Sequence, residues 1–208
     1  MNIENLDDKR KTKLFNSALK EFVSEGYDKA STNIIAKNAG LSKALMFHYI
    51  ESKEKLFLLV YDYFENIVEN EYYSKMDFSI PDIFERLRRS YILQINLIKQ
   101  VPWIVEFNKL CIPTNSDFIN TELNKRDSKK HRILDKKLIE IKDFSNFRNN
   151  LDFEKSKKII LWINIGFTNQ ILESIKKNVG ENIDSSQIIT QIDEYLVETK
   201  KLFYKTSE

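Results

Sequence analysis

Residues 31–56, STNIIAKNAGLSKALMFHYIESKEKL, decide the fold of this chain. Ser31 or Thr32 stands ahead of a first short apolar-patterned segment and Ser42 ahead of a second, where a side-chain oxygen caps a helix. Gly40 lies between the two segments, and glycine adopts the left-handed backbone that ends a helix at little cost. The stretch therefore predicts two short helices joined by a tight turn, which is a helix–turn–helix.

The second of these helices, expected over about residues 43–49, has one face for packing and one for contact. Met46 and Ile50 share the packing face, with Leu41 just ahead of them. A helix of this kind fits the major groove, where residues near its N-terminus reach base edges and neighbouring polar groups contact phosphates. Tyr49 suits either a phosphate or the core. The predicted DNA-binding residues are Ser31, Thr32, Asn33, Ser42, Lys43, Ala44, Leu45, Phe47, His48, Tyr49 and Lys53.

Helical periodicity dominates the rest of the chain. Further helices are expected over residues 9–25, 52–74, 81–100, 116–142, 152–178 and 184–204. Gly26 is expected to end the first of them in a left-handed cap, and Asp152 and Asp184 to cap the last two. The predicted fold is all-α, with a three-helix DNA-binding head over residues 1–52 and a helical ligand-binding and dimerisation domain over residues 53–208.

Composition limits the function classes. The 208 residues carry a formal net charge of +2, so basic residues that meet DNA must be positioned, because they are not in excess. Cys111 is the single cysteine, which excludes an internal disulfide and a thiolate-rich metal site and favours the reducing cytoplasm. The sequence has no secretory leader pattern, no phosphate-binding loop and no hydrolase or metalloprotease motif. We therefore expect no enzyme activity, no metal and no cofactor.

The last two helices carry apolar stripes that would pair across a two-fold axis as a four-helix bundle. In the alternative, these stripes complete the core of the monomer, which leaves one face of the last helix uncovered. The predicted dimer-interface residues are Ile163, Phe167, Ile171, Ile188, Ile192, Leu196 and Phe203.

Large aromatic residues on the middle helices predict a pocket for a small, mostly apolar effector, with an aromatic-rich core as the alternative. Asn169 or Gln170 is the expected polar anchor. The predicted ligand-binding residues are Phe64, Tyr91, Trp103, Phe107, Trp162 and Asn169.

The pattern T-x-x-I-A-x-x-A-G-L-S-K-A-L-x-F-H-Y-I-x-S-K-E-x-L, from Thr32 to Leu56, resembles the tetracycline-repressor (TetR) family of bacterial regulators. The resemblance lies within about the first quarter of the chain. It implies that Thr32 and Lys53 contact phosphate while residues 43–45 face the bases. It also implies a cytoplasmic homodimer that represses from a palindromic operator until an effector releases it.

Two departures from the family pattern concern the operator sequence. Ala44 stands where glycine is common, and Phe47 replaces a frequent tyrosine, so a hydroxyl contact to phosphate is lost. A rival interpretation is a helical protein-interaction module without sequence-specific DNA binding, which gives the glycine turn and its flanking cations no purpose.

Overall fold

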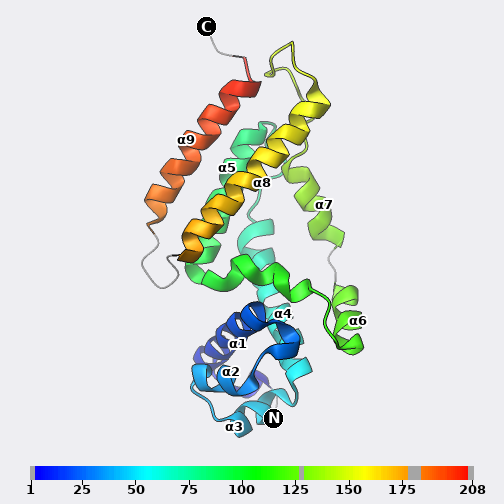
Figure 1. Cartoon of the computed structure of the whole chain (residues 1–208), viewed down its shortest axis with the longest axis vertical. Coiled ribbons are helices and arrows are strands. Elements are labelled where there is room, and N and C mark those ends of the chain that lie inside the picture. The colour runs from blue at the N-terminus through cyan, green and yellow to red at the C-terminus, as the bar shows by residue number, and fades with distance from the viewer. Residues whose placement is uncertain (1–2, 127–128, 178–183, 206–208) are drawn as a thin grey trace. The chain divides into compact units, whose positions relative to one another are not determined.

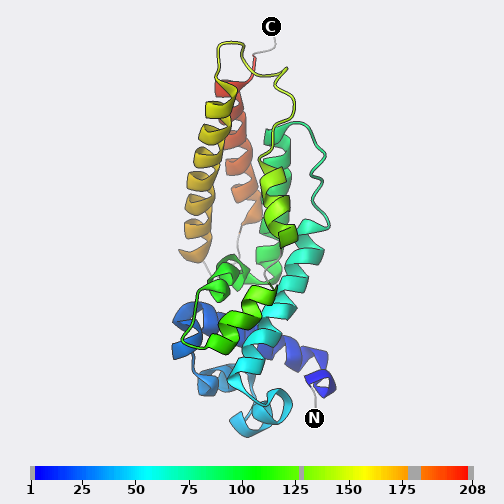
Figure 2. The same ribbon diagram turned by 90° about the vertical axis from the view of Figure 1, so that its right-hand side faces the viewer.

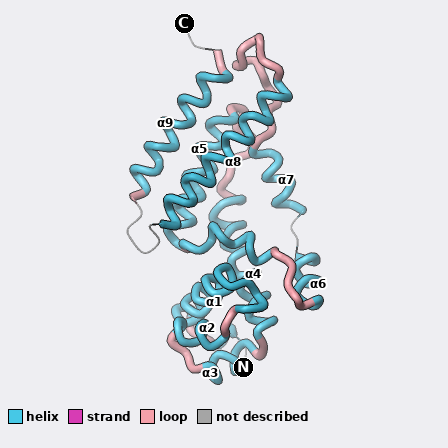
Figure 3. The backbone as a smooth tube through the Cα atoms, in the orientation of Figure 1, coloured by secondary structure: helices cyan, strands magenta, loops and turns pink. Residues whose placement is uncertain are grey.

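Helices make up the regular structure of the protein, as the computed structural model shows over residues 3–126, 129–177 and 184–205 (Figures 1 and 3). Within these ranges the one extended pairing is an isolated antiparallel bridge between Phe147 and Tyr204. The all-α prediction is therefore confirmed. The helices are η1 Ile3–Asn5, α1 Asp8–Lys29, α2 Thr32–Ala39, α3 Lys43–Ile50, α4 Lys53–Val68, η2 Glu69–Tyr73, α5 Ile83–Gln100, η3 Pro102–Cys111, α6 Asp117–Arg126, α7 Lys129–Leu138, α8 Phe153–Lys177 and α9 Ser185–Phe203.

The chain forms two compact units. Unit 1 comprises the described parts of residues 1–70 and 100–127, and unit 2 those of residues 71–99 and 128–208. Unit 1 thus contains the whole predicted head together with α4, η3 and α6. The functional boundary at residue 52 stays a prediction.

The core of unit 1 is built on α1, whose apolar stripe is buried as the periodicity predicts. Gly26 adopts φ 73° and ψ 163°, so it interrupts the helical backbone near the expected position, with a positive φ that favours glycine but a ψ outside the left-handed helical range. Just beyond it, the Tyr27 ring meets Phe57 of α4 with ring centroids 5.1 Å apart, and Phe22 meets the same ring at 5.0 Å. These contacts fasten α1 to α4.

Unit 2 is held by side chains that join α5, α8 and α9, which lie beside one another (Figure 2). The rings of Phe167 and Tyr195 stack at 3.6 Å between α8 and α9, and Tyr91 of α5 meets Phe167 edge-on at 5.8 Å. Arg88 and Asp193 form a two-pronged ion pair between α5 and α9, at 2.6 and 3.0 Å. The unit therefore has its own apolar core.

The prediction of one helix over residues 116–142 is wrong. The structure has α6 in unit 1 and α7 in unit 2, on either side of residues 127–128, which lie outside the described residues. Helix α7 ends at Leu138 because the chain is held there by Arg86, a buried residue of α5 that is 4% exposed. Its guanidinium donates to the carbonyls of Ile80 at 2.8 Å, of Leu138 at 3.2 Å, and of Glu140.

The start of helix α5 differs from the prediction, and the predicted end of α8 falls at the limit of the described residues. Helix α5 begins at Ile83, not at Pro81, because the Asp82 carboxylate accepts the backbone N–H of Phe84 at 2.9 Å and so acts as the cap. The expected end of α8 near residue 178 lies outside the described residues, which follow this helix to Lys177.

We predict that Arg86→Met lowers the free energy of unfolding by about 2–4 kcal/mol, because it leaves three carbonyls without their donor inside the protein. Arg88→Met, two residues along the same helix, is the control, since its partly exposed ion pair with Asp193 stabilises by about 1 kcal/mol or less. Urea titration followed by circular dichroism measures both. Equal losses for the two variants would contradict the assignment of Arg86.

Candidate nucleic-acid interface

The helix–turn–helix forms where the sequence predicts it. The Ser31 hydroxyl accepts the N–H of Ile34 at 3.4 Å, and the Ser42 hydroxyl accepts the N–H of Leu45 at 3.1 Å. Between the two caps, Gly40 adopts φ 73° and ψ 29°, the left-handed conformation that ends α2. Each of these three residues therefore has the local role that its type indicates.

Helix α3 has two distinct faces. Met46 and Ile50 are fully buried. The side chains of Lys43, Ala44, Leu45 and His48 are exposed, and so are Asn33 of α2 and Ser42. The exposed residues near the α3 N-terminus form a surface that suits base edges in a major groove.

The other predicted DNA-binding residues are half-buried. Phe47 was expected on the outer surface, but its ring is partly covered, with the Lys43 ammonium 5.9 Å from the ring centroid. Tyr49 packs edge-on against His48 at 5.6 Å. Ser31, Thr32 and Lys53 also lie in half-buried positions.

Lys53 is bound to the end of α1. Its ammonium donates to the carbonyl of Asp28 at 3.2 Å and lies 4.9 Å from the Tyr27 ring centroid. Burial lowers the pKa of Lys53. An ammonium has three donors, so these contacts leave hydrogens for a phosphate oxygen.

Three polar residues that hold the site together were not predicted. The Glu21 carboxylate accepts the backbone N–H of Ser31 at 2.9 Å and fixes the start of α2 on α1. The Tyr27 hydroxyl donates to Glu54 of α4 at 3.0 Å. Burial, and next the bond to Glu54, raises the pKa of Tyr27, so this donor stays protonated at physiological pH. Periodicity alone gives no signal for such contacts, because each joins residues ten or more positions apart.

Lys13 is a further cation near the turn. Its ammonium lies 3.4 Å from the place where a side chain on Gly40 would begin. Lys13 is exposed and comes from the basic run at residues 9–13 of α1. It therefore brings a positive charge to the turn between α2 and α3.

A strained turn connects α3 to α4. Glu51 has φ 65° and ψ −52°, and it is the one non-glycine residue with positive φ in the described part of the chain. The N–H of Ser52 donates to the carbonyl of Ile50 at 2.7 Å, which closes a tight γ-turn around Glu51. The Ser52 hydroxyl then caps α4 by accepting the N–H of Lys55 at 3.1 Å. This turn sets the direction of α4 relative to α3.

The predicted ligand-binding residues are divided between the units. Phe64, Trp103 and Phe107 belong to unit 1, where Phe64 is fully buried and Phe107 is buried. Tyr91, Trp162 and Asn169 belong to unit 2.

Unit 2 does not bring its three predicted ligand residues to one place. The Tyr91 hydroxyl donates to the Asn164 side chain at 2.7 Å and lies 3.0 Å from the Thr168 hydroxyl. Trp162 is 66% exposed and Asn169 is exposed, because helical spacing places them on the face of α8 opposite these partners. The polar partners of Tyr91 on α8 are therefore Asn164 and Thr168, not Asn169 or Gln170.

The residues of the predicted dimer stripe are buried or half-buried within the monomer. Ile171, Ile192, Leu196 and Phe203 are buried, and the remaining three predicted residues, Ile163, Phe167 and Ile188, are half-buried against the core of unit 2. These seven residues are thus covered, fully or in part, within the monomer, and their role in an interface stays a prediction. The large apolar residues exposed on the same helices are Phe153, Ile159, Trp162 and Ile165 of α8 and Val197 and Leu202 of α9.

The comparison with known protein families finds a match in the region of the predicted DNA-binding head. Residues 14–60 match the family model described as bacterial regulatory proteins, tetR family. A search of curated protein sequences found no match. Over the described residues, no helix is long and apolar enough to cross a membrane.

Solved structures share the fold along most of the chain. A TetR family transcriptional regulator from Chloroflexus aurantiacus is 14% identical, with 98% of this chain and 97% of that one covered and a TM-score of 0.61. A TetR-like regulator from Rhodococcus sp. RHA1 is 17% identical, with 93% and 92% covered and a TM-score of 0.55. AibR in complex with isovaleryl coenzyme A and operator DNA is 18% identical, with 75% and 83% covered and a TM-score of 0.50. At these identities the likeness concerns the fold.

We predict that Glu51→Gly is more stable than Glu51→Ala by about 1 kcal/mol, because only glycine adopts this backbone without strain. Both variants lose the ion pair with Lys55, so the comparison isolates the backbone. At Asn66, an exposed position in α4, the same pair of substitutions should show the usual order, with alanine more stable by about 1 kcal/mol. Thermal or urea unfolding of the four variants measures both differences. Alanine exceeding glycine at both positions would contradict the strained turn.

Proposed function

We propose a specific role from two findings, which are the match of residues 14–60 to the tetR family model and the fold that the chain shares with a TetR family transcriptional regulator. We propose that the chain acts as a dimeric repressor that binds a palindromic operator and releases it when a small, mostly apolar effector binds. The observation that carries the proposal is α3, a capped helix with a buried face and an exposed N-terminal face of Lys43, Ala44 and Leu45.

The chemistry of the head supports separate reading and positioning roles. Lys43 donates to guanine, and Ala44 and Leu45 contact thymine methyl groups. Thr32 at the start of α2, Lys53 and Lys13 meet phosphates, which fix the register of the head without specifying sequence. The positive end of the α2 helix dipole adds to this attraction. Specificity therefore rests on three side chains, and affinity on several more.

A homodimer gives the short reading helix direction and affinity, because two copies bind half-sites about one helical turn apart. The exposed residues Ile159, Trp162, Gly166 and Asn169 follow one another on α8 at spacings of three, four and three residues, which is one face of a helix. At Gly166 a side chain would meet nothing within 4 Å, so the backbone there is open to a partner helix. This face, with Val197 and Leu202 of α9, supports the proposed interface in place of the buried stripe.

An effector regulates by binding one conformation of the protein more tightly than another. The proposed coupling of about 1–3 kcal/mol changes operator affinity about 5- to 150-fold. AibR, which has this fold, is seen with an acyl-coenzyme A and with operator DNA, and it supports the combination of the two ligand types in one chain. The hydroxyl of Tyr91 and its partners Asn164 and Thr168 offer a polar anchor among the apolar contacts of unit 2.

We predict that selection from randomised duplex DNA enriches a palindrome, with half-sites separated by about one helical turn or somewhat more. Lys43→Ala should then weaken binding to that sequence about 5- to 150-fold at fixed salt, because it removes a donor to a base. Fluorescence anisotropy with a labelled duplex measures the loss.

Lys125→Ala is the control for Lys43→Ala, since it removes an exposed lysine of the same unit outside the helix–turn–helix. It should change operator affinity less than twofold. A failure to enrich any sequence, with folded protein and only weak salt-sensitive binding, would favour the rival interaction module.

We predict that Trp162→Ala raises the dissociation constant of the dimer at least about 30-fold, because exposed tryptophans at the centre of interfaces carry much of the binding energy. Phe118→Ala is the matched control, an aromatic residue of α6 that is also highly exposed. Analytical ultracentrifugation over a concentration series gives both constants. A dimer that is weakened by Phe118→Ala and not by Trp162→Ala would place the interface elsewhere.

A further inference from the structure

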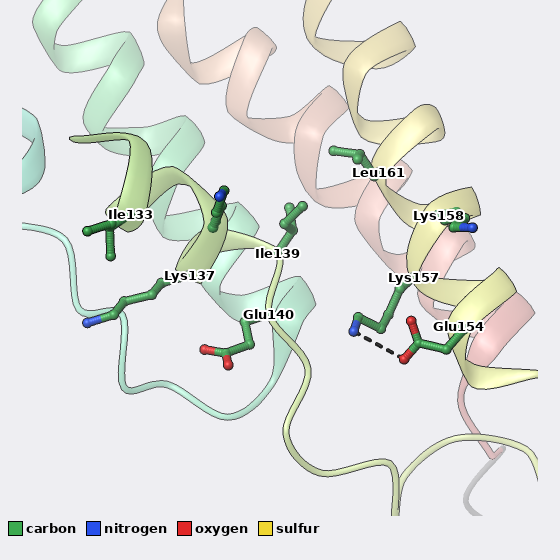
Figure 4. A pocket seen from close by; sticks show the side chains of 9 residues that line it. Ile133, Lys137, Ile139, Glu140, Glu154, Lys157, Lys158 and Leu161 are labelled. Carbon is green, nitrogen blue, oxygen red and sulfur yellow. Dashed lines mark hydrogen bonds and ion pairs between the residues drawn. The ribbon is translucent and has the colours of Figure 1, made fainter. Parts of the chain in front are cut away.

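Two features of the molecule have no part in the proposed function, a groove in unit 2 and the turn η1 in unit 1. The groove, of about 490 Å³, lies between the end of α7 and the first half of α8 (Figure 4). Lys137 and Lys158 are directed outward on opposite sides of it, and Lys157 is paired with Glu154 at 3.3 Å (Figure 4). These side chains therefore define no binding site.

The turn η1, which precedes α1, packs against α3. The elements packed most extensively against α3 are α2, α4 and η1. Ile3 of η1 and Leu6 just after it are 3% and 5% exposed. The N–H of Leu6 donates to the carbonyl of Ile3 at 3.1 Å and closes the turn. Thus η1 is a third support of α3, beside the two helices that flank α3 in the sequence.

Ion pairs attach η1 to the start of α1. The ammonium of Lys11 lies 3.1 Å from both carboxylate oxygens of Glu4. The Asp7 carboxylate caps α1 by accepting the backbone N–H of Arg10 at 3.0 Å, and it also lies 3.4 Å from the Arg10 guanidinium. Such exposed pairs contribute little to stability, so the burial of the two apolar side chains is the larger part of the attachment. Two of the four cations in the basic run at residues 9–13 thus hold η1 and the cap of α1.

Helix α3 needs support because it is short. It has eight residues, and Met46 and Ile50 are its buried side chains. A helix of this length is not stable by itself in water. If α3 moves among several positions, only a fraction of the molecules can place its exposed face correctly on a base sequence. The affinity for that sequence then falls by the same fraction.

We propose that η1 is a positioning element of the DNA-binding head, in which Ile3 and Leu6 hold α3 where its exposed N-terminal face reads the bases. This inference rests on the proposed DNA-binding function. Contacts to phosphates carry no sequence information and do not require one fixed position of α3. Loss of the support therefore weakens binding to the operator more than binding to unrelated DNA. Specificity depends in this way on two buried side chains outside the helix–turn–helix.

The test is the ratio of the affinities for the operator and for a duplex of unrelated sequence, measured by fluorescence anisotropy at fixed salt. Leu6→Ala should lower this ratio at least about tenfold, because α3 is then correctly placed in about a tenth of the molecules or fewer. Leu6→Met nearly keeps the side-chain volume and should hold the ratio within about twofold of the wild-type value. Circular dichroism confirms that each variant is folded under the conditions used.

Leu123→Ala is the matched control for Leu6→Ala. Leu123 is a leucine of α6 in the same unit, and it is 8% exposed. Its removal leaves a similar gap in the core, but it should change the affinity ratio less than about twofold. An equal fall of the ratio in Leu6→Ala and Leu123→Ala would overturn the proposal, because the effect would then be a general loss of stability.

Hydrogen exchange of the protein without DNA measures the support of α3 directly. In Leu6→Ala the amides of residues 43–50 should exchange at least about tenfold faster than in the wild type, whereas those of residues 14–22 in α1 should change less than about twofold. Unchanged exchange in α3 would overturn this inference alone. A wild-type protein that enriches no operator would instead overturn the proposed function, so the two failures are distinguishable.

Discussion

The placement of α3 depends on the contact between α1 and α4. A helix of eight residues is not stable by itself in water, so α3 exists because Met46 and Ile50 pack into a core that other helices provide. The centre of the α1–α4 contact is the ring of Phe57, which Phe22 and Tyr27 meet edge-on. Such aromatic pairs contribute about 0.5–1.5 kcal/mol each beyond the area they bury. The position of the exposed face of α3 therefore depends on the contact between α1 and α4.

Polar bonds at the edge of the same contact give it a defined geometry. The hydroxyl of Tyr27 binds Glu54, the ammonium of Lys53 binds the carbonyl of Asp28, and Glu21 binds the amide of Ser31. The first two bonds join the end of α1 to the first turn of α4, and the third joins Glu21, further back on α1, to the residue that caps α2. Apolar packing tolerates small rotations, whereas these bonds require particular distances and angles. Together they fix where the N-termini of α2 and α4 lie, and these are the ends that suit phosphates.

How much could be predicted from the sequence follows from the range of each interaction. Three residues act through hydrogen bonds to residues within four positions, which are Gly40, Ser31 and Ser42. Their roles as helix ends and caps could therefore be predicted, and these predictions are confirmed. The family pattern likewise lies inside one short stretch.

Long-range contacts were the part that could not be predicted. Arg86 lies more than fifty residues from the end of α7 that it holds, and no local sequence pattern predicts this contact. On α8 the spacing identified the apolar positions, but periodicity alone does not say which of two faces meets the core. Trp162 was therefore assigned to a pocket and Ile171 to an interface, whereas the first is exposed and the second is buried.

In the proposed function, the division of the chain constrains how a ligand in unit 2 can influence DNA binding by unit 1. The chain passes between the units near residues 70, 99 and 127, so three covalent connections join them. The first lies in the π-helix that follows α4, and the second lies in the last turn of α5, just ahead of η3, a 3₁₀ segment of ten residues. Both helix types are less favourable than the α-helix over such lengths, so a change in their geometry costs less than bending α4 or α5. Because a ligand shifts an equilibrium only by its differential affinity for two states, these joints are where two states of this chain can differ at least cost.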